Sequence, residues 1–146
     1  MKIYIGCDHA AFEEKEILKQ HLIDLGHLVE DVGTHKNERC DYPDYAAALA
    51  KGVAKDDAKG ILLCGSGIGV SMVANRFKGI RAALCRTEHD AKLSIEHNNA
   101  NVMCVGARTN SIDEIKSMID SWLFAEFQFG RHSDRIEKFT DLGEDV

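Results

Sequence analysis

One short segment, residues 60–69, constrains the fold more than any other part of the chain and reads Gly-Ile-Leu-Leu-Cys-Gly-Ser-Gly-Ile-Gly. Its first half is a continuous apolar run, which is typical of a strand buried on both faces of a parallel sheet. Three glycines at alternate positions follow the cysteine, and a helical pattern over residues 70–76 comes next. The segment therefore predicts a strand, a tight turn and a helix, the repeating unit of α/β folds.

Apolar runs and helical periodicities alternate along the rest of the chain. The runs that predict strands are 2–7, 27–31, 60–64, 80–85 and 101–105. The stretches that predict helices are 12–25, 44–54, 70–76, one opened by Thr87, 111–124 and about 131–140. This alternation predicts a Rossmann-like three-layer α/β/α sandwich with a five-stranded parallel sheet. Because the 146 residues contain no linker-like segment, we expect a single domain over residues 1–146.

The composition argues against several classes of protein. The net charge of −6 does not suit non-specific nucleic-acid binding, which needs a basic surface. No apolar run approaches the roughly 20 residues of a membrane span, and the chain opens directly on a predicted strand, so we expect no membrane contact and no signal peptide. The five cysteines are odd in number and never spaced C-x-x-C, unlike a disulfide framework or a structural zinc site. A reducing cytoplasm suits such a chain best.

The loop after Cys64 also indicates chemistry. Alternating glycines let successive backbone N–H groups point to one place, where they can hold an anion. The helix that follows contributes the positive end of its dipole, which lowers the pKa of a nearby thiol. A P-loop would need a lysine at the end of the loop, which this segment lacks. A dinucleotide-binding fingerprint would need a glycine at the position of Val70, and a cysteine phosphatase would need an arginine there. The loop predicts a base or nucleophile beside an anion site, and the alternative is a tight turn with an inert buried cysteine.

The topology of a parallel sheet assigns the other polar residues to one of two edges. Loops that follow strands share the carboxyl edge, where α/β folds bind ligands. We expect that edge to hold Asp8, His9, the Cys64 loop and Arg108, with Asp8 alternatively serving only as a helix N-cap. His97 precedes a strand and belongs to the opposite edge. It is predicted either to stabilise a helix C-terminus or to complete a site in a second subunit.

Two arginines near the end of the chain, Arg131 and Arg135, are spaced i, i+4 and so share one face of a helix. Guanidinium groups at this spacing can grip a single phosphate. The alternative is a solvated face on which Asp134 and Glu137 are their ion-pair partners.

In combination these motifs resemble the type B ribose-5-phosphate isomerases and the related galactose-6-phosphate isomerase subunits. The matching segments, in chain order, are 6–9, 41–45, 64–69, 74–76, 79–82, 97–98, 101–102 and 130–132. They span nearly the whole chain, and several motifs in the right order are far more specific than one glycine loop. Ser66 stands where many relatives carry threonine, so the hydroxyl is retained.

The resemblance implies a role for each candidate residue. Cys64 would be the base that moves a proton between C1 and C2 of an open-chain sugar, while Asp8 and His97 would assist opening of the furanose ring. The residues whose amides, together with the serine hydroxyl, would hold the enediolate oxygens are Gly65, Ser66, Gly67, Ile68 and Gly69. The residues that would bind the 5-phosphate are His9, Arg108, Arg131 and Arg135, and the one for a sugar hydroxyl is Asn98.

The resemblance also implies the assembly and the class of reaction. The family works in carbohydrate metabolism without a metal or organic cofactor, as a homodimer or a dimer of dimers. We therefore expect the helix over about residues 131–140 to pack at a dimer interface. The alternatives are an isomerase of another sugar phosphate, such as allose or galactose 6-phosphate, or a non-catalytic phosphate or nucleotide sensor. A sensor would have no need of a cysteine beside the glycine loop.

Overall fold

The computed structural model describes residues 1–146 and contains one sheet of five parallel strands. The strands are β1 (Lys2–Cys7), β2 (Leu28–Gly33), β3 (Lys59–Cys64), β4 (Ala82–Leu84) and β5 (Val102–Gly106). They lie in the order β2-β1-β3-β5-β4, so the predicted five-stranded parallel sheet is confirmed. The chain crosses over β1 on its way from β2 to β3, which makes the carboxyl ends of β1 and β3 the position where such sheets bind ligands.

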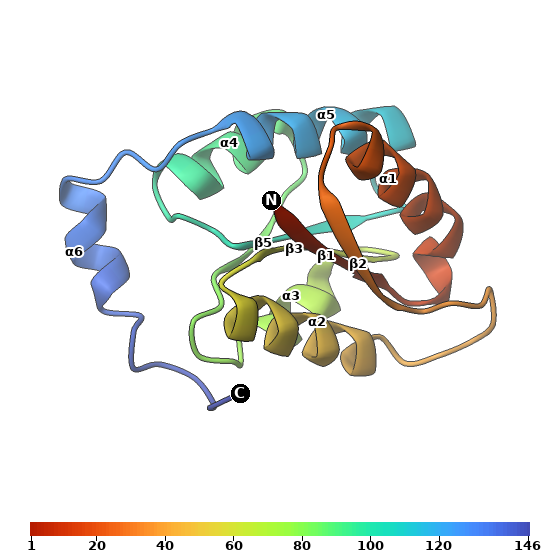
Figure 1. The fold of residues 1–146 in the computed structure, drawn as a ribbon, viewed down its shortest axis with the longest axis horizontal. Helices are drawn as coiled ribbons and strands as arrows, with labels where there is room; N and C mark the ends of the chain where they lie inside the picture. Colours follow the sequence, from red (N-terminus) through yellow and green to blue (C-terminus); the bar gives the residue numbers. More distant parts are fainter.

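Helices cover both faces of the sheet, as the predicted three-layer sandwich requires (Figure 1). The helices are α1 (Phe12–Asp24), α2 (Tyr42–Asp56), α3 (Ile68–Ala74), α4 (Glu88–Glu96), α5 (Ile112–Phe124) and α6 (Arg131–Glu137), with a short 3-10 turn η1 (His9–Ala11) before α1. In Figure 1, α1, α4 and α5 lie on one face and α2 and α3 on the other. Helix α6 stands apart from the sandwich, at the end of an extended segment.

The sheet is buried on both faces, which explains why residues 60–64 of β3 are a continuous run of apolar residues. Its residues Ile61, Leu62 and Leu63 are all fully buried. Trp122 packs on the face covered by α1, α4 and α5, and Leu49 packs on the opposite face. Because successive strand side chains point to opposite faces, a strand between two helical layers needs apolar residues at every position. No helix is both long enough and apolar enough to cross a membrane.

Most predicted boundaries shift by one to three residues; for example, α2 covers Tyr42–Asp56 instead of 44–54 and β2 covers Leu28–Gly33 instead of 27–31. Strand β4 starts at Ala82 instead of residue 80, because asparagine side chains bind the backbone just before it: Asn101 Oδ1 accepts from the Arg81 N–H and Asn75 Oδ1 from the Ala82 N–H, both at 2.8 Å. Helix α3 begins at Ile68, two residues earlier than predicted, with Gly67 as its N-cap. Helix α6 ends at Glu137, earlier than the predicted 140.

Candidate active site

The thiol of Cys64 lies at the carboxyl end of β3 and is nearly buried, with 5% of the residue exposed. Its Sγ accepts a hydrogen bond from the backbone N–H of Gly67 at 3.1 Å. A hydrogen bond donated to sulfur stabilises negative charge there, which is the form that accepts a proton. The loop therefore turns at least one N–H toward the thiol.

The glycines of this loop are needed because the backbone packs on the end of β5. Gly67 has φ +77°, and a Cβ there would lie 2.8 Å from the carbonyl carbon of Val105. A Cβ on Gly106 would lie 2.7 Å from the carbonyl carbon of Ser66. Backbone atoms cannot yield to such contacts, so only glycine allows this approach. The shape of the loop is thus fixed by backbone packing on a buried strand.

The hydroxyl of Ser66 supports the first turn of α3. Its Oγ accepts a hydrogen bond from the Ile68 N–H at 3.1 Å. Because the oxygen acts as the acceptor in this bond, the hydroxyl hydrogen can still be donated to a bound group. The predicted contact between Ser66 and an anion is therefore compatible with its capping role.

Asp8 and His9 follow β1 at the same edge of the sheet. Asp8 is 7% exposed and its Oδ1 accepts a hydrogen bond from the Ala10 N–H at 3.0 Å, so it caps η1 as the alternative interpretation predicted. His9 Nδ1 lies 3.2 Å from both the backbone nitrogen and the carbonyl oxygen of Cys40, so it accepts from the first in one tautomer and donates to the second in the other. In the tautomer that accepts on Nδ1, Nε2 carries the proton and can donate it to a ligand.

Arg108 joins this group from the loop after β5. Its side chain lies against Gly65, where a Cβ would be 3.4 Å from the guanidinium Nη1. Together with His9 it lines a cavity of about 360 Å³, whose other lining residues are Ala10, Phe12, Glu13, Glu14 and Asn37. The structure thus brings together Asp8, His9, the Cys64 loop and Arg108, as their places in the sequence predicted.

The remaining candidate residues lie at the other edge of the sheet. His97 is the C-cap of α4, and Asn98 follows it. The imidazole ring of His97 stacks on that of His132 in α6, with the ring centroids 4.4 Å apart and the ring planes at 13° to each other. The strand register places Gly60 beside Val102, at the amino end, and the four steps from Gly60 to Cys64 span about 13 Å. One chain therefore does not bring His97, Asn98, Arg131 or Arg135 to its own Cys64.

The other buried thiols differ from Cys64 in their environment. Burial raises the pKa of both Cys7 and Cys85 to about 12. Burial also raises the pKa of Cys104 well above its ordinary value. These three sulfurs stay protonated at neutral pH and pack as apolar side chains. Among the buried cysteines, only Cys64 stands at the mouth of a glycine loop.

Two residues that lie next to candidate site residues, Tyr42 and His132, were not predicted from the sequence to contribute to the site. The ring of Tyr42 lies over the first turn of α3, where a Cβ on Gly69 would be 2.6 Å from it. His132 is 7% exposed, and burial, His97, Arg131 and Arg135 together lower its pKa, so its ring is neutral at neutral pH. Both residues belong to motifs that the sequence analysis matched to a family, and that match was the only signal available for them.

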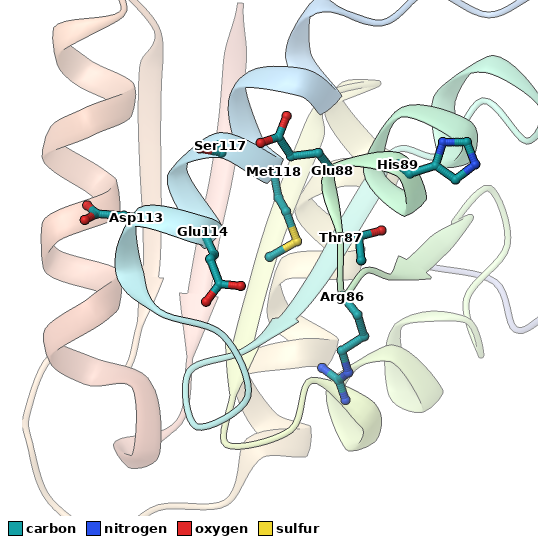
Figure 2. Close-up of a pocket in the computed structure, with 8 residues that line it drawn as sticks. All are labelled: Arg86, Thr87, Glu88, His89, Asp113, Glu114, Ser117 and Met118. Carbon is teal, nitrogen blue, oxygen red and sulfur yellow. The ribbon is translucent and has the colours of Figure 1, made fainter.

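A separate groove lies between the start of α4 with the two residues before it and the first two turns of α5 (Figure 2). Its volume is about 540 Å³, and its lining residues are Arg86, Thr87, Glu88, His89, Asp113, Glu114, Ser117 and Met118. None of them is a predicted site residue. Three carboxylates against one arginine make the groove unfavourable for an anionic ligand.

Comparisons with known proteins agree with this architecture. The family model described as Ribose/Galactose Isomerase matches residues 3–139. Ribose-5-phosphate isomerase B of Escherichia coli K12 is 44% identical over 142 residues, which cover 97% of this chain and 95% of that protein. Galactose-6-phosphate isomerase subunit LacB of Clostridium acetobutylicum is 41% identical, over 97% of this chain and 82% of that protein. The structure of Clostridium thermocellum ribose-5-phosphate isomerase B superimposes with a TM-score of 0.94 at 42% identity, covering 97% and 96% of the two chains.

Proposed function

Because the chain belongs to the Ribose/Galactose Isomerase family and is a sugar-phosphate isomerase, we propose that its substrates are ribose 5-phosphate and ribulose 5-phosphate. The observation that carries the proposal is the Cys64 thiol held at the mouth of the glycine loop, with the Gly67 N–H 3.1 Å from its sulfur. A proton acceptor beside a set of backbone donors is what an aldose–ketose isomerisation requires.

In the proposed reaction Cys64 takes the proton from C2 of the open-chain aldose. The electron pair of the broken C–H bond forms the C1–C2 double bond of an enediolate, and negative charge moves to oxygen. The same proton returns to C1 while the C2 hydroxyl passes its own proton to the C1 oxygen, so that the C2 oxygen becomes the ketone carbonyl and the C1 oxygen a hydroxyl. The reverse sequence converts the ketose to the aldose, so one base serves both directions.

The charge that develops on the enediolate oxygens is the main barrier to this chemistry. The N–H groups of residues 65–69 and the Ser66 hydroxyl are proposed to hold these oxygens. Each well-placed donor of this kind is worth roughly 10²–10³ in rate. Gly67 and Gly106 fix the path of the loop by backbone packing. The Gly67 N–H, which bonds Cys64 Sγ, and the Ile68 N–H, which bonds Ser66 Oγ, would have to share their hydrogen or turn to the enediolate oxygen when the charge appears.

The rest of the substrate is proposed to contact both groups of polar residues. His9 and Arg108 would hold the phosphate from the carboxyl edge, and Arg131 and Arg135 would hold it from a second copy of the chain. His97 of that copy would donate a proton during ring opening with the help of Asp8, and Asn98 would bind a sugar hydroxyl. This arrangement requires a homodimer with two equivalent shared sites, because one chain keeps its two groups at opposite edges.

A galactose or allose 6-phosphate substrate is the second candidate. The 41% identity to a galactose-6-phosphate isomerase subunit favours it. The presence of Cys64 together with Asp8 and His9 favours a complete isomerase subunit over half of a mixed enzyme. A non-catalytic phosphate sensor is disfavoured because it gains nothing from a thiol beside the loop.

The experiment that tests the proposal is a direct assay of the purified protein. Ribose 5-phosphate, allose 6-phosphate and galactose 6-phosphate are supplied separately, and formation of each ketose is followed. We expect the highest kcat/KM with ribose 5-phosphate. A higher value with either hexose phosphate transfers the assignment to that sugar, and no turnover of any of them contradicts an isomerase assignment for the site.

A further inference from the structure

Helix α6 has little core to hold it in place. Of its seven residues only His132 is buried. The helix stands apart from the sandwich in Figure 1, after an extended segment that leaves α5. A helix of two turns is not stable alone in water. The position of α6 therefore depends strongly on how the chain is attached before the helix and after it.

The first attachment is at the start of the helix. The His132 ring stacks on His97 at 4.4 Å, and just before the helix the Gln128 N–H donates to the Glu96 carbonyl at 3.0 Å. Both contacts fix the beginning of α6 to the end of α4. At the other end of the helix, Ile136 and Phe139 lie beside Gly79 and Arg81 around a cavity of about 90 Å³, and neither of these two apolar side chains is buried.

The second attachment is made by the last residues of the chain. The Lys78 N–H donates to the Glu144 carbonyl at 2.9 Å, and the Glu144 N–H donates to the Arg76 carbonyl at 2.7 Å. These two bonds enclose Phe77 in a parallel bridge. Ion pairs flank them, from Lys78 Nζ to Asp145 at 2.9 Å and from Arg76 to Glu144 at 3.7 Å. The ion pairs are exposed and contribute little, so the backbone pairing carries the attachment.

Gly143 makes this pairing possible. Its φ is +110°, and a Cβ there would lie 2.8 Å from the Lys78 nitrogen and 2.9 Å from the Phe77 carbonyl carbon. These are backbone atoms, which cannot move aside as a flexible side chain would. Any other residue at 143 must push the tail away from the loop that follows α3.

We propose that residues 143–145 are a clasp that positions α6, and with it Arg131 and Arg135, for binding the substrate phosphate. The proposal rests on the proposed function. Residues of the clasp touch no substrate and act as positioning residues for the two arginines. Because α6 is also fixed at His132, losing the clasp lets the helix rotate about that end. Arg131 and Arg135 then no longer face the same phosphate.

The test variant is Gly143→Ala, with Gly26→Ala as its matched control. Gly26 also has a positive φ, +89°, but nothing lies within 4 Å of its added Cβ, and it precedes the edge strand β2, on the opposite side of the sheet from β4. In Gly143→Ala we expect KM for ribose 5-phosphate and the inhibition constant of inorganic phosphate to rise together, about tenfold, as displaced positioning groups produce. We expect kcat to change by less than about threefold, since the Cys64 loop is untouched. Gly26→Ala should keep both wild-type constants.

A chain that ends at Leu142 removes the clasp without inserting a side chain, and it carries the test if Gly143→Ala does not fold. It should show the same rise in both constants. Wild-type constants in both variants overturn the clasp. So does a fall in kcat with dissociation into monomers, which would assign the tail to assembly. Binding of inorganic phosphate, measured by calorimetry, tests the clasp even if the wild-type protein has no turnover, so its failure is distinct from failure of the proposed function.

Discussion

At the carboxyl edge of the sheet, backbone packs on backbone, whereas at the amino edge the polar side chains stand outside the core. Gly67 and Gly106 let the Cys64 loop lie directly on the end of β5. Arg131 and Arg135 are exposed on a two-turn helix that is held by a ring stack and a tail. Both regions carry candidate site residues, but only the first is an integral part of the sandwich.

The difference matches the demands of the two tasks in the proposed reaction. A base and its oxyanion donors must be held within about 0.5 Å of the productive geometry. A phosphate carries its charge over several oxygens, and long guanidinium side chains can follow it. The reacting end is therefore best placed on the buried strand, and the phosphate end can be placed on a helix outside the core.

The largest effect should come from the carboxyl edge. Cys64→Ala should lower kcat by about 10²–10⁴, because a methyl group cannot accept the proton, while KM should change little. Steady-state kinetics with ribose 5-phosphate measures both constants. Cys104→Ala is the control, since this fully buried thiol packs on the same face of the sheet. More than about a tenth of wild-type kcat in Cys64→Ala would contradict its role as the base.

The next effect should come from the amino edge and should differ in kind. In the double variant Arg131→Ala with Arg135→Ala, KM should rise about 10²-fold, because two charge-assisted hydrogen bonds to phosphate are lost. A smaller fall in kcat should accompany it, since phosphate binding also positions the reacting carbons. Lys138→Ala, an exposed charge at the end of the same helix, should behave as wild type. An unchanged KM in the double variant would show that Arg131 and Arg135 are solvent-exposed residues that do not bind the phosphate.

Mixing subunits tests whether the two edges meet across an interface. Cys64→Ala and His97→Ala proteins should each be inactive alone. Random re-pairing makes half of the dimers mixed, and each mixed dimer has one intact site out of two. Activity should therefore return to about a quarter of wild type. If subunits exchange, as mass spectrometry can verify, and activity does not return, the site is not shared.

The smallest effect concerns stability at the two edges. Burial alone would raise the pKa of Asp31 near the end of β2, but hydrogen bonds from Lys15 and Lys19 outweigh it and lower the pKa. Stability from a lowered carboxyl pKa is present above its unfolded value of about 3.9 and is lost as the pH falls through the folded value. Asp31→Asn should thus cost about 2 kcal/mol at pH 7, and the difference should vanish in strong acid.

Asp56→Asn is the matched change at the amino edge. Hydrogen bonds from Lys2 and Tyr4 lower the pKa of this carboxyl too, but the pair lies at the surface and is screened by salt. Urea unfolding of both variants between pH 2 and pH 7 measures the difference. Equal losses at pH 7 would show that the carboxyl edge is no more firmly built than the amino edge.

Features that depend on neighbouring residues were predicted well. Thr87 opens α4 as predicted, accepting from the Asp90 N–H at 3.0 Å, and Ser111 and Glu114 form a capping box at the start of the predicted helix over 111–124. The alternation of apolar runs with helical periodicities along the chain predicted the parallel sheet and placed Cys64 at its carboxyl edge. Each of these features is decided within a few residues along the chain, by periodicity or by a hydrogen bond to the next turn.

Features that depend on distant residues could not be predicted. The start of β4 depends on Asn101, which lies 20 residues beyond Arg81 along the chain. The stack of His97 on His132 and the pairing of Glu144 with Arg76 join segments that no local pattern relates. Nothing in their spacing distinguishes these contacts from the many others that a chain of this length could form.

The sequence by itself determined the layers, the strand-turn-helix unit around Cys64 and the division of polar residues between two edges, because alternation of strands and helices leaves one way to bury a parallel sheet. Only the tertiary structure decided the strand order, the burial of the Cys64 thiol and the contacts that hold α6 in place. These depend on which backbones can approach one another, at Gly67, Gly106 and Gly143, and close approach is a property of the packed chain.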